Sequence, residues 1–306
     1  MSLGTTPNQM PSALSAPLQR TESGRFAAYW ALTKPRVTFM VVLTALAGYA
    51  MAAVGSLDWG LLLNLALGTF FIAGGTAGLN QALEAQADAR MQRTAMRPLP
   101  AGSIDPPAAL FFTTVLVFSG ALYLALLVSP SSSLLGVLTA SLYLFVYTPL
   151  KSHTIWCTTI GAIPGAIPPL MGWAAVRSPL EPGALALFAL LFFWQFPHFY
   201  AIAWMYRDDY RKGGFRMLPL ADGSEGRTAR HITVHSVLLI AVSLLPFVVG
   251  MTGWLYLAGS LALGWIPLRA ALKVSRQRTP QAAAGVLRAS VIYLPLMLIL
   301  LIAGKL

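Results

Sequence analysis

Nine long apolar runs constrain this chain more than any other feature of its sequence. They cover approximately residues 37–55, 60–79, 107–129, 132–149, 154–175, 183–206, 233–251, 252–268 and 289–306. A helix needs roughly 20 apolar residues to cross the hydrocarbon core of a bilayer, and each run is close to that length. Only 10% of the residues are charged, against about a quarter in a soluble domain. We therefore expect an all-α, multi-pass membrane protein with nine transmembrane helices.

The basic residues predict which side of the membrane each loop faces. The chain has 21 Lys and Arg against 10 Asp and Glu, and nine spans place every basic residue except Arg177 and Lys305 on one side. Because positive loops stay in the cytoplasm, the N-terminus and the loops after even-numbered spans are expected there. In a membrane protein this charge excess indicates orientation and anionic ligands, and we expect no nucleic-acid partner.

The ends of the chain predict a simple domain organisation. Residues 1–24 are rich in Ser, Thr, Pro and Gln and are expected to form a disordered tail. Residues 25–306 are expected to form a single nine-helix transmembrane domain. No short apolar stretch precedes residue 37, which argues against a cleaved signal peptide. The single cysteine, Cys157, predicts neither an internal disulfide nor a zinc site.

Acidic residues gather in two stretches that both follow even-numbered spans. In the first stretch Asn80, Glu84 and Asp88 are four residues apart, so they project from one face of a helix. Three oxygen-bearing side chains suit a hard cation such as Mg²⁺. Arg93 and Arg97 follow at once, and guanidinium groups bind phosphate oxygens well. The pattern predicts a diphosphate site.

The second acidic stretch, after the sixth span, has the same mixture of charges. Asp208 and Asp209 are followed by Arg211 and Lys212. Four carboxylates and a diphosphate would repel one another without metal, and divalent cations with the nearby bases would neutralise them. The alternative is that both stretches are ordinary solvated loops whose acids and bases pair. The one-face spacing and the duplication favour the diphosphate site.

Two features inside the predicted spans leave alternatives open. His198 is an ionisable residue within the sixth span, and it is either a ligand or base near an acceptor, or a neutral histidine hydrogen-bonded across the bundle. The fifth span contains Pro164, Pro168 and Pro169 and must bend. Its small residues either line a cavity or allow close helix packing, and we favour the cavity.

Several motifs together resemble a known family. They are Leu32–Thr38 with Lys34-Pro35-Arg36, the Asn80–Pro100 run, Tyr147–Lys151, Gly161–Trp173, and Trp194-Gln-Phe-Pro-His198-Phe199 leading to Asp209-Tyr210. The chain resembles the intramembrane prenyltransferases of the UbiA superfamily over residues 30–220, and within it the haem-farnesylating branch. Quinone-type members usually carry Asp at the position of Glu84 and a second DxxxD pattern, which is absent here.

The resemblance implies a fold, substrates and a set of site residues. It implies helices around a central cavity that opens laterally, in the inner membrane of a bacterium, with farnesyl diphosphate as donor and haem b as acceptor, giving haem O. Haem A synthase or a terminal oxidase assembly would be a possible partner, beside membrane lipids. Glu84, Asp88 and Asp209 would hold Mg²⁺, with Asn80, Asp208 and His198 as further catalytic residues. Arg93, Arg97, Lys151, Arg211 and Lys212 would bind the diphosphate, and Tyr147 would shield a carbocation or stack on the porphyrin.

Two other functions are compatible with the sequence. The first is a related prenyltransferase that acts on a quinone precursor, against which Glu84 and the Trp194–His198 element argue. The second is an anion transporter, which would place charges near the middle of the membrane with access from both sides. In this sequence the acids and arginines crowd one side, which favours an enzyme.

Overall fold

The structure is a computed structural model that describes residues 22–220 and 225–306, and these residues are almost entirely helical. The predicted tail, residues 1–24, lies outside the described residues except for its last three, since the first helix begins at Glu22. The helices are α1 Glu22–Leu32, α2 Pro35–Ala52, α3 Trp59–Leu83, α4 Ala85–Arg90, α5 Pro106–Leu127, α6 Pro130–Ser141, η1 Leu142–Tyr147, α7 Thr148–Leu150, α8 Cys157–Ala166, α9 Pro168–Trp173, α10 Pro182–Met205, α11 Arg207–Gly213, η2 Leu218–Leu220, α12 Glu225–Ser243, α13 Leu245–Val248, α14 Trp254–Gln277 and α15 Pro280–Ala303.

The predicted membrane architecture agrees with the helices that the structure contains. Eight helical segments in the described part of the chain are long and apolar enough to cross a bilayer. The predicted fifth span corresponds to α8 and α9, which are separated at Ile167. Because neither piece spans a bilayer by length alone, the count of nine crossings stays a prediction. The bend has the expected cause, since Pro168 and Pro169 lack the backbone donors that a continuous helix needs.

The last two long helices, α14 and α15, extend farther than the apolar runs predicted. The predicted eighth span ended at 268, whereas α14 continues to Gln277, and the predicted ninth span began at 289, whereas α15 begins at Pro280. Ala, Gln, Lys and Arg occupy the extra turns and are strong helix formers, so the helix does not stop where its apolar stretch stops. The predicted loop is reduced to a turn at Arg278, which adopts the left-handed conformation, and Thr279, whose side chain caps α15.

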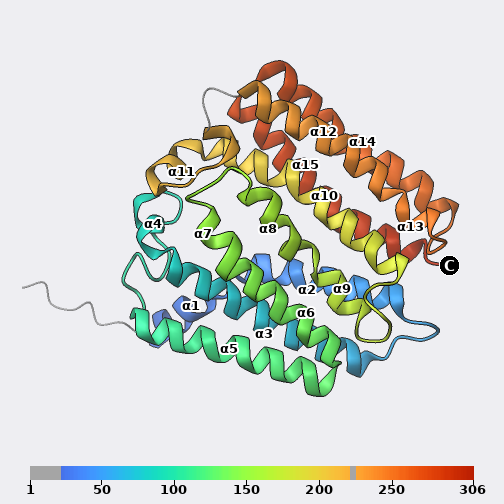
Figure 1. Ribbon diagram of the computed structural model, residues 1–306, viewed down its shortest axis with the longest axis horizontal. Helices are drawn as coiled ribbons and strands as arrows, with labels where there is room; N and C mark the ends of the chain where they lie inside the picture. Colours follow the sequence, from blue (N-terminus) through green and yellow to red (C-terminus); the bar gives the residue numbers. More distant parts are fainter. Residues whose placement is uncertain (1–21, 221–224) are drawn as a thin grey trace, which may run out of the picture.

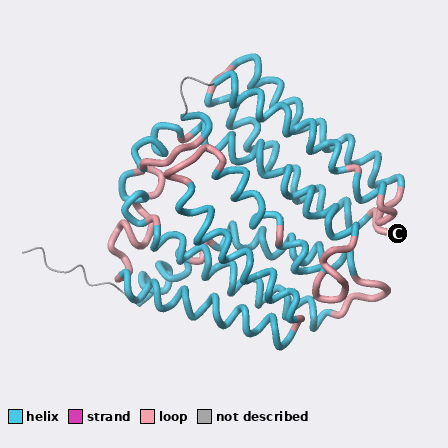
Figure 2. Tube along the Cα trace, viewed as in Figure 1, coloured by secondary structure: helices cyan, strands magenta, loops and turns pink. Residues whose placement is uncertain are grey.

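Helix contacts run around the bundle and close it. The helix α2 packs against α3 and α9, α3 packs against α5, and α10 packs against α8, α12 and α15. The helix α15 also contacts α2, so the last long helix lies beside the first transmembrane helix. Two ends result (Figure 1): α4 and α11 lie at one end, and α13 and the C-terminus lie at the other. Figure 2 shows loops gathered at these two ends.

Candidate active site

The predicted row of polar residues lies at the inner side of the end formed by α4 and α11. Asn80, Glu84 and Asp88 are all buried, with exposed fractions of 1%, 8% and 1%. The helix is interrupted at Glu84, which separates α3 from α4. The amide of Glu84 nevertheless donates to Asn80 O, and that of Asp88 donates to Glu84 O. These two bonds preserve the four-residue spacing across the break, so the three side chains share one face as predicted.

Three cations from separate parts of the chain meet this row. Lys151 donates to Glu84 Oε1 at 2.7 Å, and Arg97 donates to Asp88 Oδ2 at 2.6 Å. Lys34 donates to Asn80 Oδ1 at 3.1 Å, and Asn80 in turn donates to Thr148 Oγ1 at 3.1 Å. We call Lys34, Arg97, Lys151, Glu84 and Asp88, together with Asn80, the charged cluster. It contains three cations and two carboxylates, so it carries a surplus of positive charge.

The backbone of Lys34 is strained at the place where its side chain reaches the cluster. Its backbone is left-handed, with φ 46° and ψ 59°, directly before Pro35 at the start of α2. A following proline disfavours the right-handed helical conformation, and a left-handed residue other than glycine is strained by about 1–2 kcal/mol. Burial, together with the positive charges of Arg97 and Lys151, lowers the pKa of the Lys34 ammonium to about 7. A bound anion would raise the pKa of Lys34 and so oppose the effects of burial and of the neighbouring cations.

Aromatic rings surround the Lys151 ammonium. It lies 4.6 Å from the centre of the Tyr147 ring and 6.0 Å from that of Tyr143, both in the π-helical segment η1. Phe215, which follows α11, places its ring 5.8 Å away. Burial alone would lower the pKa of Lys151, but Tyr147 and the Glu84 carboxylate raise it above its ordinary value. Lys151 is therefore a permanently charged group in an environment with little water.

The second acidic stretch lies directly against the first. Asp209 accepts hydrogen bonds from the backbone amides of Gln92 and Arg93, at 3.3 and 3.0 Å. The guanidinium of Arg93 lies 4.5 Å from the centre of the Tyr206 ring and donates to the hydroxyl of Tyr210 at 3.0 Å. These contacts attach α11 to the segment after α4 (Figure 1). The two acidic stretches, more than a hundred residues apart in sequence, thus form one end of the bundle.

The remaining predicted residues of the second stretch are at the surface. Asp208 pairs with Arg211 at 3.2 Å, and both side chains are exposed. Lys212 is exposed as well. Within the described residues, no three Asp, Glu, His or Cys side chains gather around one point. The assignment of Asp209 as a metal ligand and of Arg211 and Lys212 as phosphate ligands therefore stays a prediction.

His198 forms a hydrogen bond across the bundle, which is the second of the two alternatives that the sequence left open. Its Nδ1 lies 2.9 Å from Ser290 Oγ of α15, and its ring stacks on that of Trp194 with centroids 4.8 Å apart. Gln195 instead donates to Ala162 O of α8 at 2.9 Å. His198 is thus hydrogen-bonded across the bundle, and a role near an acceptor stays a prediction.

Two residues at the site, Lys34 and Tyr143, had no role predicted from the sequence. Lys34 and Tyr143 lie far from the acidic stretches in the sequence. The only available signal for Lys34 was the Lys-Pro-Arg order just before the first apolar run, because the residue before a proline is often locally constrained. Tyr143 lies within an apolar run, where an aromatic residue carries no distinct signal.

Sequence comparison places this chain in a family of enzymes. The model of the UbiA prenyltransferase family matches residues 41–296, so the chain belongs to that family and is a transferase. A protoheme IX farnesyltransferase of Solibacter usitatus is 45% identical over 277 residues, which cover 88% of this chain and 95% of the relative. The protoheme IX farnesyltransferase of Salinibacter ruber is 43% identical over 274 residues, covering 90% and 97%. The predicted family resemblance is confirmed.

Solved structures show the same fold at low sequence identity. A digeranylgeranylglyceryl phosphate synthase aligns with a TM-score of 0.75 at 18% identity, over 92% of this chain and 98% of that one. A UbiA homolog from Archaeoglobus fulgidus bound to DMAPP and Mg²⁺ aligns with a TM-score of 0.61 at 13% identity, over 90% and 99%. Together with the eight apolar helices, these matches define an integral, multi-pass membrane protein of the UbiA fold.

Proposed function

We propose that this chain transfers a farnesyl group from farnesyl diphosphate to a vinyl group of haem b and so forms haem O. Relatives that are 43–45% identical over most of their length are named for protohaem IX farnesyl transfer. In the reaction, the allylic C–O bond breaks and its electron pair leaves with diphosphate. The vinyl electrons then form the new C–C bond, and water adds a hydroxyl group and releases a proton.

The observation that best supports this proposal is the positive surplus of the charged cluster. Lys34, Arg97 and Lys151 face only two carboxylates, in a setting where Glu84, Asp88 and Lys151 are buried. A buried net charge is costly unless it is paired. A diphosphate ester with about three negative charges would pair these cations, and one divalent cation would bring the assembly close to neutrality.

The residues of the first stretch suit a magnesium ion. Asp88 Oδ1 is buried and has no hydrogen-bond partner among the described residues, which is an unusual state for a carboxylate oxygen. Glu84 and Asn80 add further oxygens on the same face, and such ligands are the ones Mg²⁺ prefers. We propose that Glu84 and Asp88 hold the ion. Bound there, Mg²⁺ would stabilise negative charge on the departing diphosphate.

The protein groups perform the remaining tasks in this proposal. Arg97 and Lys34 orient the diphosphate, while Lys151 holds Glu84 in place and adds positive charge beside the leaving group. Tyr143 and Tyr147 present ring faces next to that charge, and such faces also stabilise an allylic cation. Asp209 fixes the segment at Gln92 and Arg93 that follows the magnesium ligands. In this proposal Asp209 acts as a positioning residue.

The proposed setting is the inner membrane of a bacterium, with the charged cluster facing the cytoplasm. All basic residues except Arg177 and Lys305 would then lie on the cytoplasmic side. The central cavity for farnesyl and haem is part of the same proposal. A groove of about 570 Å³ lies between α1, α3 and α5, and one of its lining residues, Thr33, precedes Lys34. A haem A synthase or oxidase assembly as partner also remains part of the proposal.

The proposal is tested by product analysis in membranes that contain the chain. Membranes are incubated with haem b, farnesyl diphosphate and Mg²⁺, and haem products are identified by mass. Wild-type membranes are expected to form haem O, and removal of Mg²⁺ with a chelator is expected to stop the reaction. Lys34→Met is expected to reduce the rate roughly tenfold or more, because it removes a charged hydrogen bond to the diphosphate.

The Lys34→Met variant is informative because Lys34 contacts the neutral Asn80 in this structure, so its loss leaves no carboxylate without a partner. Arg230→Met, on the exposed side of α12, removes the same charge at the same end of the bundle and is expected to retain full activity. Prenylation of an added aromatic quinone precursor in place of haem would contradict the proposed acceptor. Equal activity of Lys34→Met and wild type would contradict the proposed diphosphate site.

A further inference from the structure

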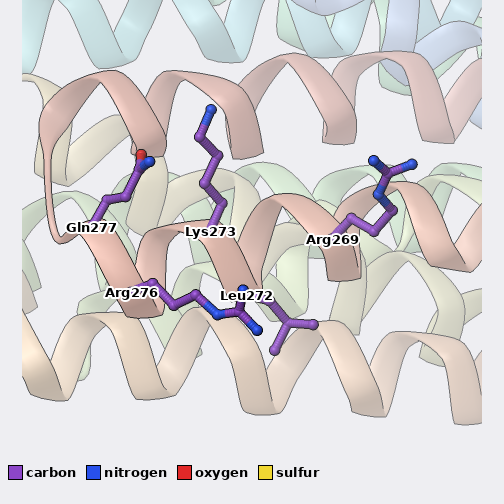
Figure 3. A pocket seen from close by; sticks show the side chains of 5 residues that line it. All are labelled: Arg269, Leu272, Lys273, Arg276 and Gln277. Atoms are coloured by element: carbon purple, nitrogen blue, oxygen red, sulfur yellow. The ribbon is translucent and has the colours of Figure 1, made fainter.

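The cytoplasm-proximal end of α14 carries a basic hollow that the proposed reaction does not use. A cavity of about 370 Å³ is lined by Arg269, Leu272, Lys273, Arg276 and Gln277 (Figure 3). All five residues come from one helix, spaced so that they project from one side of it. Figure 3 shows Arg269 and Lys273 extending to the same side, with Arg276 beside Leu272. Arg269, Lys273 and Arg276 are exposed.

Among the described residues, no carboxylate forms an ion pair with these three cations. The chain contains no Asp or Glu after Glu225, and Glu225 pairs with Arg207 at 2.8 Å. An anion from outside the protein would therefore meet three positive charges that form no ion pair within the described part of the chain.

The same side of α14 becomes apolar one turn before the basic residues. Trp265 is 53% exposed and Leu261 is 49% exposed, and they precede Arg269 at four-residue intervals. The opposite side of the helix is buried, with Ala271 and Val274 packed in the core that α12 and α15 share. One continuous outer stripe thus changes from apolar to cationic toward the cytoplasmic end.

We propose that this stripe binds an anionic phospholipid of the cytoplasmic leaflet. Its phosphate would lie among Arg269, Lys273 and Arg276, and an acyl chain would follow Trp265 and Leu261. The order of charges along the helix matches the order of headgroup and chain in a lipid, and basic residues at this depth attract anionic headgroups. The helix α14 packs mainly on α12 and α15, across the bundle from α3 and α5 (Figure 1), so a membrane lipid suits this place better than a haem propionate does.

The position of Trp265 allows a direct test in vesicles that contain the full-length chain. Brominated lipids quench tryptophan fluorescence on contact, and the difference between wild type and Trp265→Phe isolates the signal of this residue. At equal mole fraction in phosphatidylcholine vesicles, brominated phosphatidylglycerol is expected to quench Trp265 several-fold more than brominated phosphatidylcholine. The variant Arg269→Gln/Lys273→Gln/Arg276→Gln is expected to lower the apparent affinity for phosphatidylglycerol on the order of tenfold or more.

A matched variant controls for general loss of charge. Arg227→Gln/Arg230→Gln/Arg288→Gln removes three exposed cations at the same end of α12 and α15 and is expected to keep the preference for phosphatidylglycerol. Equal quenching by both lipids, or equal loss in both triple variants, would overturn the proposal.

The proposal would also be overturned if inorganic phosphate, but not chloride at the same ionic strength, removed the preference for phosphatidylglycerol, because the site would then bind free phosphate. Loss of haem binding with unchanged lipid preference in the first variant would assign the stripe to haem instead. No outcome depends on transferase activity.

Discussion

At the scale of single residues, Lys34 is the most unusual group in the charged cluster. It combines a strained backbone, a hydrogen bond to Asn80 and an ammonium whose pKa burial lowers to about 7. The two other cations are paired with carboxylates, whereas Lys34 has a neutral partner. This arrangement leaves Lys34 the cation most sensitive to an incoming anion.

Binding of diphosphate to the cluster should therefore depend on pH. Without an anion, Lys34 is mostly charged at pH 6 and mostly neutral at pH 8, so affinity should fall as pH rises through about 7. Above pH 7 binding should be accompanied by proton uptake, measured by calorimetry in buffers of different ionisation enthalpy. Part of this uptake comes from the titration of diphosphate itself. Lys34→Met should abolish the remainder. Identical uptake in wild type and variant would show that Lys34 does not meet the anion.

The same shift of the Lys34 pKa has a defined effect on stability. Between pH 7 and the ordinary pKa of lysine, near 10.4, the unfolded chain binds a proton that the folded chain has released. The contribution of Lys34 to the free energy of unfolding of the anion-free protein therefore rises with pH across that window. Below pH 7 both states bind the proton, and Lys34 then lowers stability by a constant amount.

At the scale of elements, the break between α8 and α9 is accompanied by close packing against α2. A Cβ added at Gly172 of α9 would lie 1.7 Å from Ala45 O, and one added at Gly48 of α2 would lie 2.1 Å from Pro169 O. Backbone contacts backbone here, so these glycines serve close helix packing. For the fifth span the sequence favoured a cavity lining over close helix packing. The lack of space for a Cβ at Gly172 depends on the neighbouring helix α2, which a sequence pattern does not reveal.

The substitution Gly172→Ala is accordingly expected to lower stability. Helices α2 and α9 would have to separate, at a cost of roughly 1–3 kcal/mol, and thermal unfolding in detergent should shift to lower temperature. Gly285→Ala is the matched control, because a Cβ at Gly285 of α15 would have no atom of the described residues within 4 Å. Alanine in a helix is favoured over glycine by roughly 0.5–1 kcal/mol, so this control should be neutral or stabilising. A stabilising Gly172→Ala would contradict the close contact.

At the scale of the whole molecule, the C-terminal residues close the bundle at the end opposite the charged cluster. Lys305 donates to the carbonyls of Ala50 and Ala53 at the end of α2, at 2.6 and 2.5 Å. Thr252 forms an antiparallel bridge with Lys305, which connects the turn before α14 to the same place. The cation also meets the negative end of the α2 helix dipole, where positive charge is favourable.

Lys305→Met should weaken this closure. Loss of two charged hydrogen bonds at a partly exposed site is expected to cost about 1–3 kcal/mol, seen as a lower unfolding temperature in detergent. Haem O formation at a temperature where the variant is folded should remain near that of wild type, because the charged cluster lies at the other end. Unchanged thermal stability would show that the two hydrogen bonds make no net contribution to the stability of the folded protein.

The sequence alone indicated a helical, multi-pass membrane protein and the row Asn80, Glu84 and Asp88 on one helical face. These properties depend on local composition and on helix periodicity, which are readable from neighbouring residues. The full extent of α14 and α15 was not predicted, because helix propensity continues beyond the apolar stretch that marks a span.

Only the tertiary structure decided which groups meet. It brings Lys34 and Lys151 to the row, turns Asp209 toward the backbone amides of Gln92 and Arg93, and joins His198 to Ser290. The physical reason is that each partner lies on a different helix or connecting segment, and the direction of a side chain across a bundle depends on how whole helices pack. A pattern within one helix contains no information about that packing.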